Sequence, residues 1–135
     1  MNELIETRQA TIERTHDQLI EVRYKPGITI DPTGLSEVLS ERERLCGGGS
    51  GQAVLAVIPP DADFQMALMT SDHYKGRPVT DCTRFLAVAA SSTMHERMAS
   101  LYFAYFPQHF RTAIFADESE ARAWLKTSLT GITLS

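Results

Sequence analysis

Residues 53–58 have the sequence AVLAVI, and residues 85–90 have the sequence FLAVAA. Neither stretch contains a polar residue, and each is shorter than a typical helix. An apolar run of this length is typical of a strand that is covered on both faces of a sheet. We therefore predict two central strands here. The paired prolines Pro59 and Pro60 end the first of them.

The segments around these strands alternate between extended and helical patterns. Before strand 53–58 we expect a hairpin (11–16 and 19–24), a short strand (28–30) and a helix from Asp31-Pro32 to the glycines at 47–51. Between strands 53–58 and 85–90 we expect a short helix capped by Asp61 or Asp63. After strand 85–90 we expect a helix from Thr93 to about Phe106, a strand at 111–115, and a last helix from 117–120 to near Gly131. Successive strand–helix units favour parallel pairing, and the hairpin adds an antiparallel pair. The sequence thus predicts a mixed sheet.

The helix after Asp31 is expected to be amphipathic. Its apolar residues recur at helical spacing, and charged residues lie between them. The apolar set is Leu35, Val38, Leu39, Leu45 and Cys46, and the charged set is Glu37, Glu41, Arg42, Glu43 and Arg44. We expect this helix to lie on the sheet.

The chain has 135 residues, which predicts one domain over 1–135, with flexible ends at 1–8 and 130–135. Thirteen basic and seventeen acidic residues give a net charge of −4. Nucleic acids and anionic membranes are bound mainly through clustered cations, so this balance argues against both as partners.

Two features predict a cytoplasmic protein without a membrane span. The opening residues lack the basic start and apolar run of a secretory signal, and the longest apolar run, 53–60, is too short to cross a bilayer. Cys46 and Cys82 form no C-x-x-C pair, which argues against a zinc ribbon or a thioredoxin motif. We expect each thiol to be a small buried hydrophobe in a reducing compartment.

The element order resembles that of the SpoIIAA-like, or STAS, domains of bacteria. The segments LIEVRYKPG (19–27) and FADE (115–118) through AWL (123–125) are also similar to uncharacterised bacterial members of that group. The resemblance implies an α/β fold: a single-domain mixed sheet of about five strands with about four helices, in SpoIIAA-like (STAS) topology.

Anti-sigma-factor antagonists of this group carry a phosphorylatable serine at the start of the helix after the central strand. This chain has the sequence PPDAD at residues 59–63 instead. The resemblance therefore does not extend to phosphoserine switching at that position.

No constellation of catalytic residues is visible, and we predict that the protein is not an enzyme. The glycines at 47–51 follow a helix, whereas a phosphate loop precedes one, so they are expected to be a connector. Asp61 and Asp63 follow a central strand, where ligand crevices form, but helix capping is favoured for both. The four histidines are scattered, His95 is expected at the surface, and neither a metal nor a cofactor is predicted.

Ser91, Ser92 and Thr93 stand at the predicted start of a helix. Their hydroxyls and the free N–H groups of the helix suit a bound anion or a phosphoryl group. The competing interpretation, which is favoured, is helix capping.

Residues 101–110, LYFAYFPQHF, contain five of the eleven aromatic residues of the chain. We single out Tyr102, Phe103, Phe106 and Phe110 as candidate partner- or ligand-binding residues, because one helical stripe cannot direct all of them to the sheet. A homodimer contact, a groove for a partner, an apolar ligand and plain core packing all remain open.

The sequence therefore predicts a non-catalytic protein-interaction or regulatory domain, which forms a homodimer and has a possible regulatory protein partner. The alternative is a carrier or sensor of a small apolar ligand or lipid. It follows from the grouping of some SpoIIAA-like relatives with Sec14-type lipid-binding domains.

Overall fold

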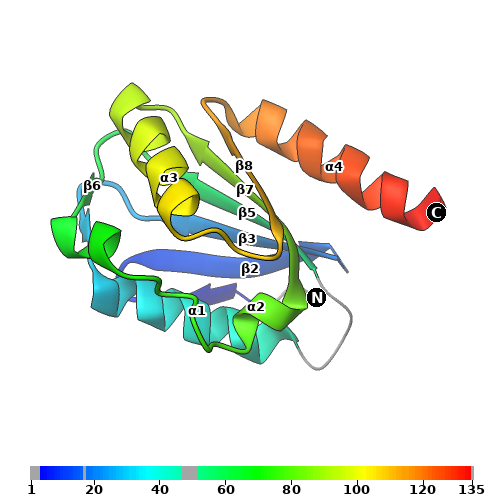
Figure 1. Cartoon of the computed structure of the whole chain (residues 1–135), viewed down its shortest axis with the longest axis horizontal. Helices are drawn as coiled ribbons and strands as arrows, with labels where there is room; N and C mark the ends of the chain where they lie inside the picture. The colour runs from blue at the N-terminus through cyan, green and yellow to red at the C-terminus, as the bar shows by residue number, and fades with distance from the viewer. Residues whose placement is uncertain (1–3, 17, 47–51, 135) are drawn as a thin grey trace.

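The computed structural model describes residues 4–16, 18–46 and 52–134, and its centre is a six-stranded mixed sheet (Figure 1). The strand order is β1-β2-β3-β5-β7-β8. The bounds are Leu4–Glu6 (β1), Ala10–His16 (β2), Leu19–Tyr24 (β3), Gln52–Ile58 (β5), Thr83–Ala90 (β7) and Arg111–Phe115 (β8). Strands β1, β2 and β3 pair antiparallel, whereas β3, β5, β7 and β8 pair parallel.

The mixed sheet is as predicted, with one strand more than expected. The extra strand, β1, lies within the stretch that was expected to be flexible, and it pairs with β2. At the other end, helix α4 (Glu118–Leu134) continues three residues past Gly131, where the sequence predicted its end. The expected glycine connector at 47–51 lies outside the described residues.

Alternate residues of the central strands separate the core into two halves. Val22 of β3, Ala56 of β5 and Val88 of β7 are register partners, and all three pack in the larger cluster. Their neighbours Leu55 and Ala87 pack in the smaller cluster on the opposite face. This alternation follows from the two-residue period of a strand, and it explains why neither 53–58 nor 85–90 contains a polar residue.

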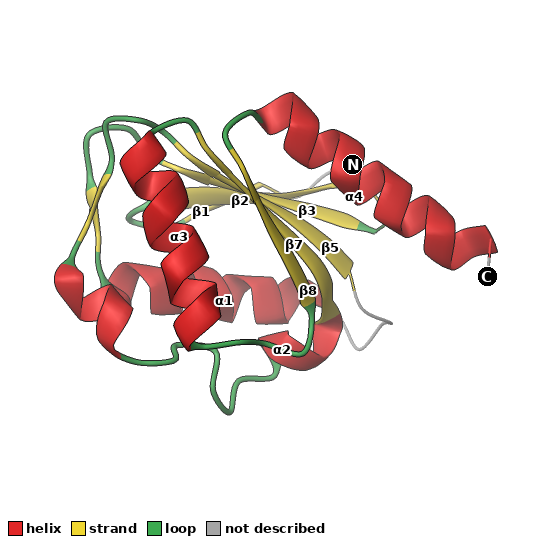
Figure 2. Cartoon of the chain, turned by 45° about the horizontal axis from the view of Figure 1, so that its top comes forward, coloured by secondary structure: helices red, strands yellow, loops and turns green. Residues whose placement is uncertain are grey.

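Helices cover both faces of the sheet (Figure 2). Helix α1 (Pro32–Cys46) and helix α3 (Thr93–Tyr105) contribute to the larger cluster, and α4 contributes Ala121 and Leu125 to the smaller one. Helix α3 begins at Thr93, as predicted, and its N-cap is Ser92, which accepts a hydrogen bond from the backbone N–H of His95.

The chain between β5 and β7, residues 59–82, is here called the cover segment. It contains strand β6 (Asp63–Phe64), a 3-10 helix η1 (Met66–Thr70) and the short helix α2 (Val79–Cys82). The short helix predicted after Asp61 or Asp63 is the 3-10 helix η1, which begins later than expected, at Met66, and has no side-chain cap, so the predicted capping by an aspartate is wrong. The backbone of β6 pairs with β4 (Thr29–Ile30) instead, through hydrogen bonds such as Asp63 N–H to Ile28 O, at 2.8 Å.

Cys46 and Cys82 form a disulfide, with their Cα atoms 6.0 Å apart. The prediction of two free thiols was therefore wrong. The bond joins the end of α1 to the end of α2, across 36 positions of sequence. Sequence spacing did not indicate the pair, because the two ends meet only after both helices have packed on the same side of the sheet.

Candidate functional site

A cavity of about 110 Å³ lies between the sheet and the helices α1 and α3, with the cover segment along one side. Apolar side chains form nearly all of its wall. The sheet contributes Val22, Tyr24, Val54, Ala56, Ile58, Leu86 and Val88, β4 contributes Ile30, α1 contributes Leu35, Val38, Leu39 and Arg42, the cover segment contributes Phe64, Leu68, Met69 and Tyr74, and α3 contributes Met98, Ala99, Tyr102 and Phe103.

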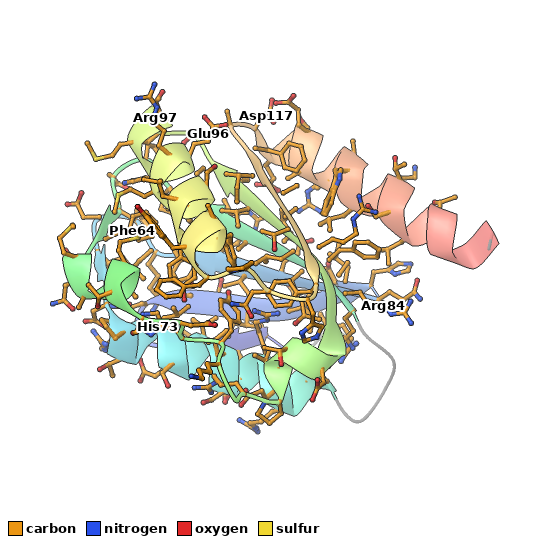
Figure 3. The ribbon with its side chains drawn as sticks, in the orientation of Figure 1. Phe64, His73, Arg84, Glu96, Arg97 and Asp117 are labelled. Atoms are coloured by element: carbon orange, nitrogen blue, oxygen red, sulfur yellow. A yellow bond between two sulfur atoms is a disulfide. The ribbon has the colours of Figure 1, made fainter. Side chains whose placement is uncertain are left out.

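The cover segment is held near α3 by hydrogen bonds to one aromatic side chain. The hydroxyl of Tyr102 accepts a hydrogen bond from the backbone N–H of His73, at 2.9 Å, and donates one to the carbonyl oxygen of Ser71, at 3.2 Å. Figure 3 shows Phe64 and His73 on the side of the molecule that carries η1 and α3. Burial raises the pKa of Tyr102 to about 12, so its hydroxyl keeps its proton at neutral pH.

Arg42 is the single charged side chain in this wall. It is only 3% exposed. The sequence grouped it with the charged residues between the apolar positions of α1. It lies seven residues after Leu35 and four after Val38, however, so it belongs to the buried face of the helix. That spacing was the signal in the sequence that Arg42 is buried.

The guanidinium of Arg42 forms hydrogen bonds with two hydroxyl groups, those of Thr83 and Tyr74, and with no carboxylate of the described residues. Its Nη2 donates to Oγ1 of Thr83, at 2.7 Å, and the Thr83 hydroxyl in turn donates to the carbonyl oxygen of Val79. Its Nε is buried without a hydrogen-bond partner among the described residues, and no described carboxylate forms an ion pair with it. The neighbouring Glu43 is occupied by Arg77, at 3.0 Å. An incompletely paired buried ion costs several kcal/mol of stability, so its presence needs a reason.

Electrostatics at this site follow from burial. Burial lowers the pKa of Arg42, and interactions with Tyr74 and Tyr24 oppose that shift. Burial also raises the pKa of Tyr24 and of Tyr74. Both phenols are therefore neutral near pH 7 and can act as hydrogen-bond donors beside the guanidinium.

The structure brings the four candidate aromatic residues together around the cavity. Tyr102 and Phe103 line it directly. Phe106 packs against Tyr102, with ring centroids 5.2 Å apart, and Phe110 packs edge-on against Tyr74, at 5.6 Å. All four contribute to the larger core cluster, and two of them, Tyr102 and Phe103, also line the cavity.

The other candidate residues lie elsewhere. Ser92 caps α3, while Ser91 and Thr93 are exposed, as the capping interpretation expects. Asp61 and Asp63 are exposed and do not line the cavity.

The surface position expected for His95 was wrong. It is 4% exposed and packs edge-on against Phe64, at 5.1 Å. Within the described ranges, no group of three or more His, Cys, Asp or Glu residues is placed to hold a metal ion.

A cluster of ion pairs on the opposite face of the sheet was also not predicted. Glu21 of β3 is 8% exposed and receives two hydrogen bonds from Arg122 of α4, at 2.8 and 3.1 Å. Arg23 bonds both oxygens of Glu118, at 2.8 and 3.0 Å. The cluster joins the first turn of α4 to β3. Alternation along β3 placed Glu21 and Arg23 together but did not indicate their partners.

The ion cluster predicts a loss of stability in acid. Hydrogen bonds from Arg23 lower the pKa of Glu118 to about 2, and bonds from Arg122 and Thr15 outweigh burial to lower the pKa of Glu21. Both contributions are complete above about pH 5 and disappear as the pH falls through the folded-state pKa. The Glu118 side chain is 35% exposed, so we discount its share to about 1 kcal/mol.

Urea denaturation at pH 7 and pH 3 measures this difference. Glu118→Gln is expected to flatten the change between the two pH values. Glu120→Gln is the control, because Glu120 is an exposed residue of the same helix turn outside the cluster. A wild-type stability that is equal at both pH values would contradict the prediction.

A family model decides where the chain belongs. Residues 13–129 match the model described as Domain of unknown function (DUF7793). The chain belongs to the DUF7793 family. No protein with a curated description matches it.

The fold of this DUF7793 domain is similar to that of a solved structure. The crystal structure of an uncharacterized protein from the DUF3478 family, with a SpoIIAA-like fold, from Shewanella loihica PV-4, is similar with a TM-score of 0.60 at 14% identity. The similarity covers 93% of this chain and 95% of that one. The predicted SpoIIAA-like fold is therefore confirmed. None of the described helices is both long enough and apolar enough to cross a membrane.

Proposed function

We propose that this DUF7793 domain is a non-catalytic binding domain that holds a small, largely apolar molecule between its sheet and the helices α1 and α3. The cavity of about 110 Å³ carries the proposal. Protein interiors are normally packed with few voids larger than a water molecule, whereas an apolar cavity of about 150 Å³ admits benzene. Of the two functions predicted from the sequence, the cavity supports the ligand carrier or sensor.

The side chains of the cavity wall support a role without catalysis. General acid–base chemistry near neutral pH uses a histidine or a carboxylate within reach of the substrate. The ionisable side chains in this wall are an arginine and three tyrosines, namely Arg42, Tyr24, Tyr74 and Tyr102. Burial keeps the tyrosines neutral, and neither of the two groups that exchange protons easily at pH 7 is among them.

Filling the cavity is expected to abolish binding. Ala99 of α3 lines the cavity, and Ala99→Leu adds three carbon atoms to its wall. We expect pentan-1-ol to shift the NMR signals of the cavity methyl groups in the wild type, and the shifts to be at least tenfold smaller in the variant. Ala104→Leu is the matched control, because Ala104 is exposed on the same helix.

Two results would contradict this proposal. One is a wild type that shows saturable shifts with neither pentan-1-ol nor pentanoate although its thermal unfolding is cooperative. The other is equal binding by the wild type and Ala99→Leu.

A second candidate function, self-association, is supported by the outer face of α3. Met94, Leu101 and Tyr105 are 66%, 50% and 72% exposed, and their spacing of seven and four residues places them on one face. We propose this face, rather than Phe103 and Phe106, as the homodimer contact. Native mass spectrometry tests it: the dimer expected for the wild type should be lost in Leu101→Ser/Tyr105→Ser, and a monomeric wild type would reject it.

The disulfide provides a test of the cytoplasmic location, which we retain as a proposal. Disulfides are rare in the reducing cytosol. Thiols trapped by alkylation in intact cells report the state of Cys46 and Cys82. A reduced pair is expected for a cytoplasmic protein, and a fully oxidised pair would place the domain in an oxidising compartment.

A further inference from the structure

We propose that the cavity binds a small monocarboxylate and that Arg42 binds its negative charge. This inference rests on the proposed function, because it specifies the class of molecule that occupies the same cavity. The partners of the guanidinium, the charge of the wall and the size of the cavity all favour this class of ligand.

Arg42 lines the cavity, and its hydrogen bonds leave the Nε–H donor without a partner among the described residues. A guanidinium has five N–H donors in a rigid plane, and two of them along one edge match the two oxygens of a carboxylate. Thr83 accepts from Nη2, while Nε is buried without a partner in the described part of the chain. The hydroxyls of Tyr24 and Tyr74 line the same cavity, and both are neutral donors near pH 7.

The charge of the wall selects a single negative charge. Among the described residues that line the cavity, Arg42 is the only cation and none is a carboxylate. A dianion, such as a phosphate monoester, would bring one charge more than this wall balances. A neutral molecule would leave the guanidinium as it is now, at the full cost of its burial.

The volume of the cavity limits the size of the apolar part of the ligand. Benzene, with six carbon atoms, occupies a cavity of about 150 Å³. A space of about 110 Å³ therefore suits an apolar body of about four carbon atoms. The apolar residues of the sheet and of α3 would contact this body while the carboxylate faces α1. A long-chain lipid does not fit this space.

The purely structural role of Arg42 is to connect α1 to Thr83 at the start of β7. That role uses hydrogen bonds to the hydroxyls of Thr83 and Tyr74, which a neutral side chain such as glutamine can make without a buried charge. It gives no reason for placing a cation against an apolar cavity. A bound carboxylate does give one, because it converts an unpaired buried ion into a paired one.

The test compares three molecules that share a five-carbon chain and differ in charge: pentanoate, pentan-1-ol and the pentylammonium cation. Binding to the full chain is followed by NMR titration at pH 7. We expect pentanoate to bind the wild type at least tenfold more tightly than pentan-1-ol, and pentylammonium to bind more weakly than either. In Arg42→Met, the preference for pentanoate should disappear while pentan-1-ol still binds.

The outcomes separate this inference from the proposed function. If pentan-1-ol binds the wild type as tightly as pentanoate, the carboxylate assignment is wrong and the apolar cavity remains a binding site. If none of the three binds, the proposed function fails as well. The wild-type comparison decides between these results even if Arg42→Met does not fold. A folded Arg42→Met that keeps the tenfold preference would show that another group binds the charge.

Discussion

Removing the Cys46–Cys82 disulfide is expected to lower the free energy of unfolding by about 3 to 4 kcal/mol. A crosslink stabilises a protein mainly by restricting the unfolded chain, and closing a loop of 36 positions corresponds to about that amount in the chain-entropy model. Urea denaturation of the double variant Cys46→Ser/Cys82→Ser, compared with the oxidised wild type, measures the difference. Loss of the covalent connection between α1 and the cover segment is also expected to weaken ligand binding.

A reductant provides the control for this prediction. It should lower the stability of the wild type to about that of the double variant and leave the double variant unchanged. Mass spectrometry after alkylation in denaturant determines whether the bond is present. Two alkylated cysteines in wild-type protein purified without reductant would contradict the disulfide itself.

Replacing Arg42 with methionine is expected to raise the free energy of unfolding of the ligand-free protein, by about 1 to 3 kcal/mol. Methionine fills similar space without a charge. Apolar residues that replace buried ions of matched volume are often neutral or stabilising. The result would identify Arg42 as a residue retained for binding at a cost in stability. Thermal and urea unfolding of dialysed protein provide the measurement.

Arg44→Met is the matched substitution for this experiment. Arg44 lies two residues further along α1, with a side chain that is 71% exposed, so its replacement should change stability by less than about 0.5 kcal/mol. A drop of several kcal/mol in Arg42→Met, with Arg44→Met unaffected, would mean that Arg42 supports the fold through its contact with Thr83.

The central sheet was predictable because the residues that identify each strand lie within one short stretch of sequence. Two short, uninterrupted apolar stretches are typical of buried strands, and the charge alternation of 19–24 places one face of that strand toward solvent or polar partners. Helix-capping residues, and the glycine and proline residues that end helices, then predicted the bounds of the long helices α1, α3 and α4 to within a few residues. The cover segment was not predictable in this way, because Asp63 and Phe64 have no strong preference of their own. They become a strand only because residues 29 and 30 provide a partner.

The candidate site was likewise predictable only in part. The aromatic stretch at 101–110 indicated that something apolar had to be covered, and Tyr102 and Phe103 do line the cavity. The contribution of Arg42 depends on the rotation of α1 about its axis, and a charged residue is normally assigned to the exposed side of a helix. The disulfide depends on where two helices end in space. Neither feature has a signal within a short window of sequence.

The strand order of the sheet has a consequence for synthesis of the chain. Neighbours in the main sheet follow the order of the sequence, from β1 at one edge to β8 at the other. Each strand therefore finds its partner already made when it leaves the ribosome, and none has to insert between two paired strands. We expect the sheet to grow in one direction from its N-terminal hairpin. Its exposed apolar edge is then always the newest strand, and the interval before β8 arrives is when the nascent domain is most prone to aggregate.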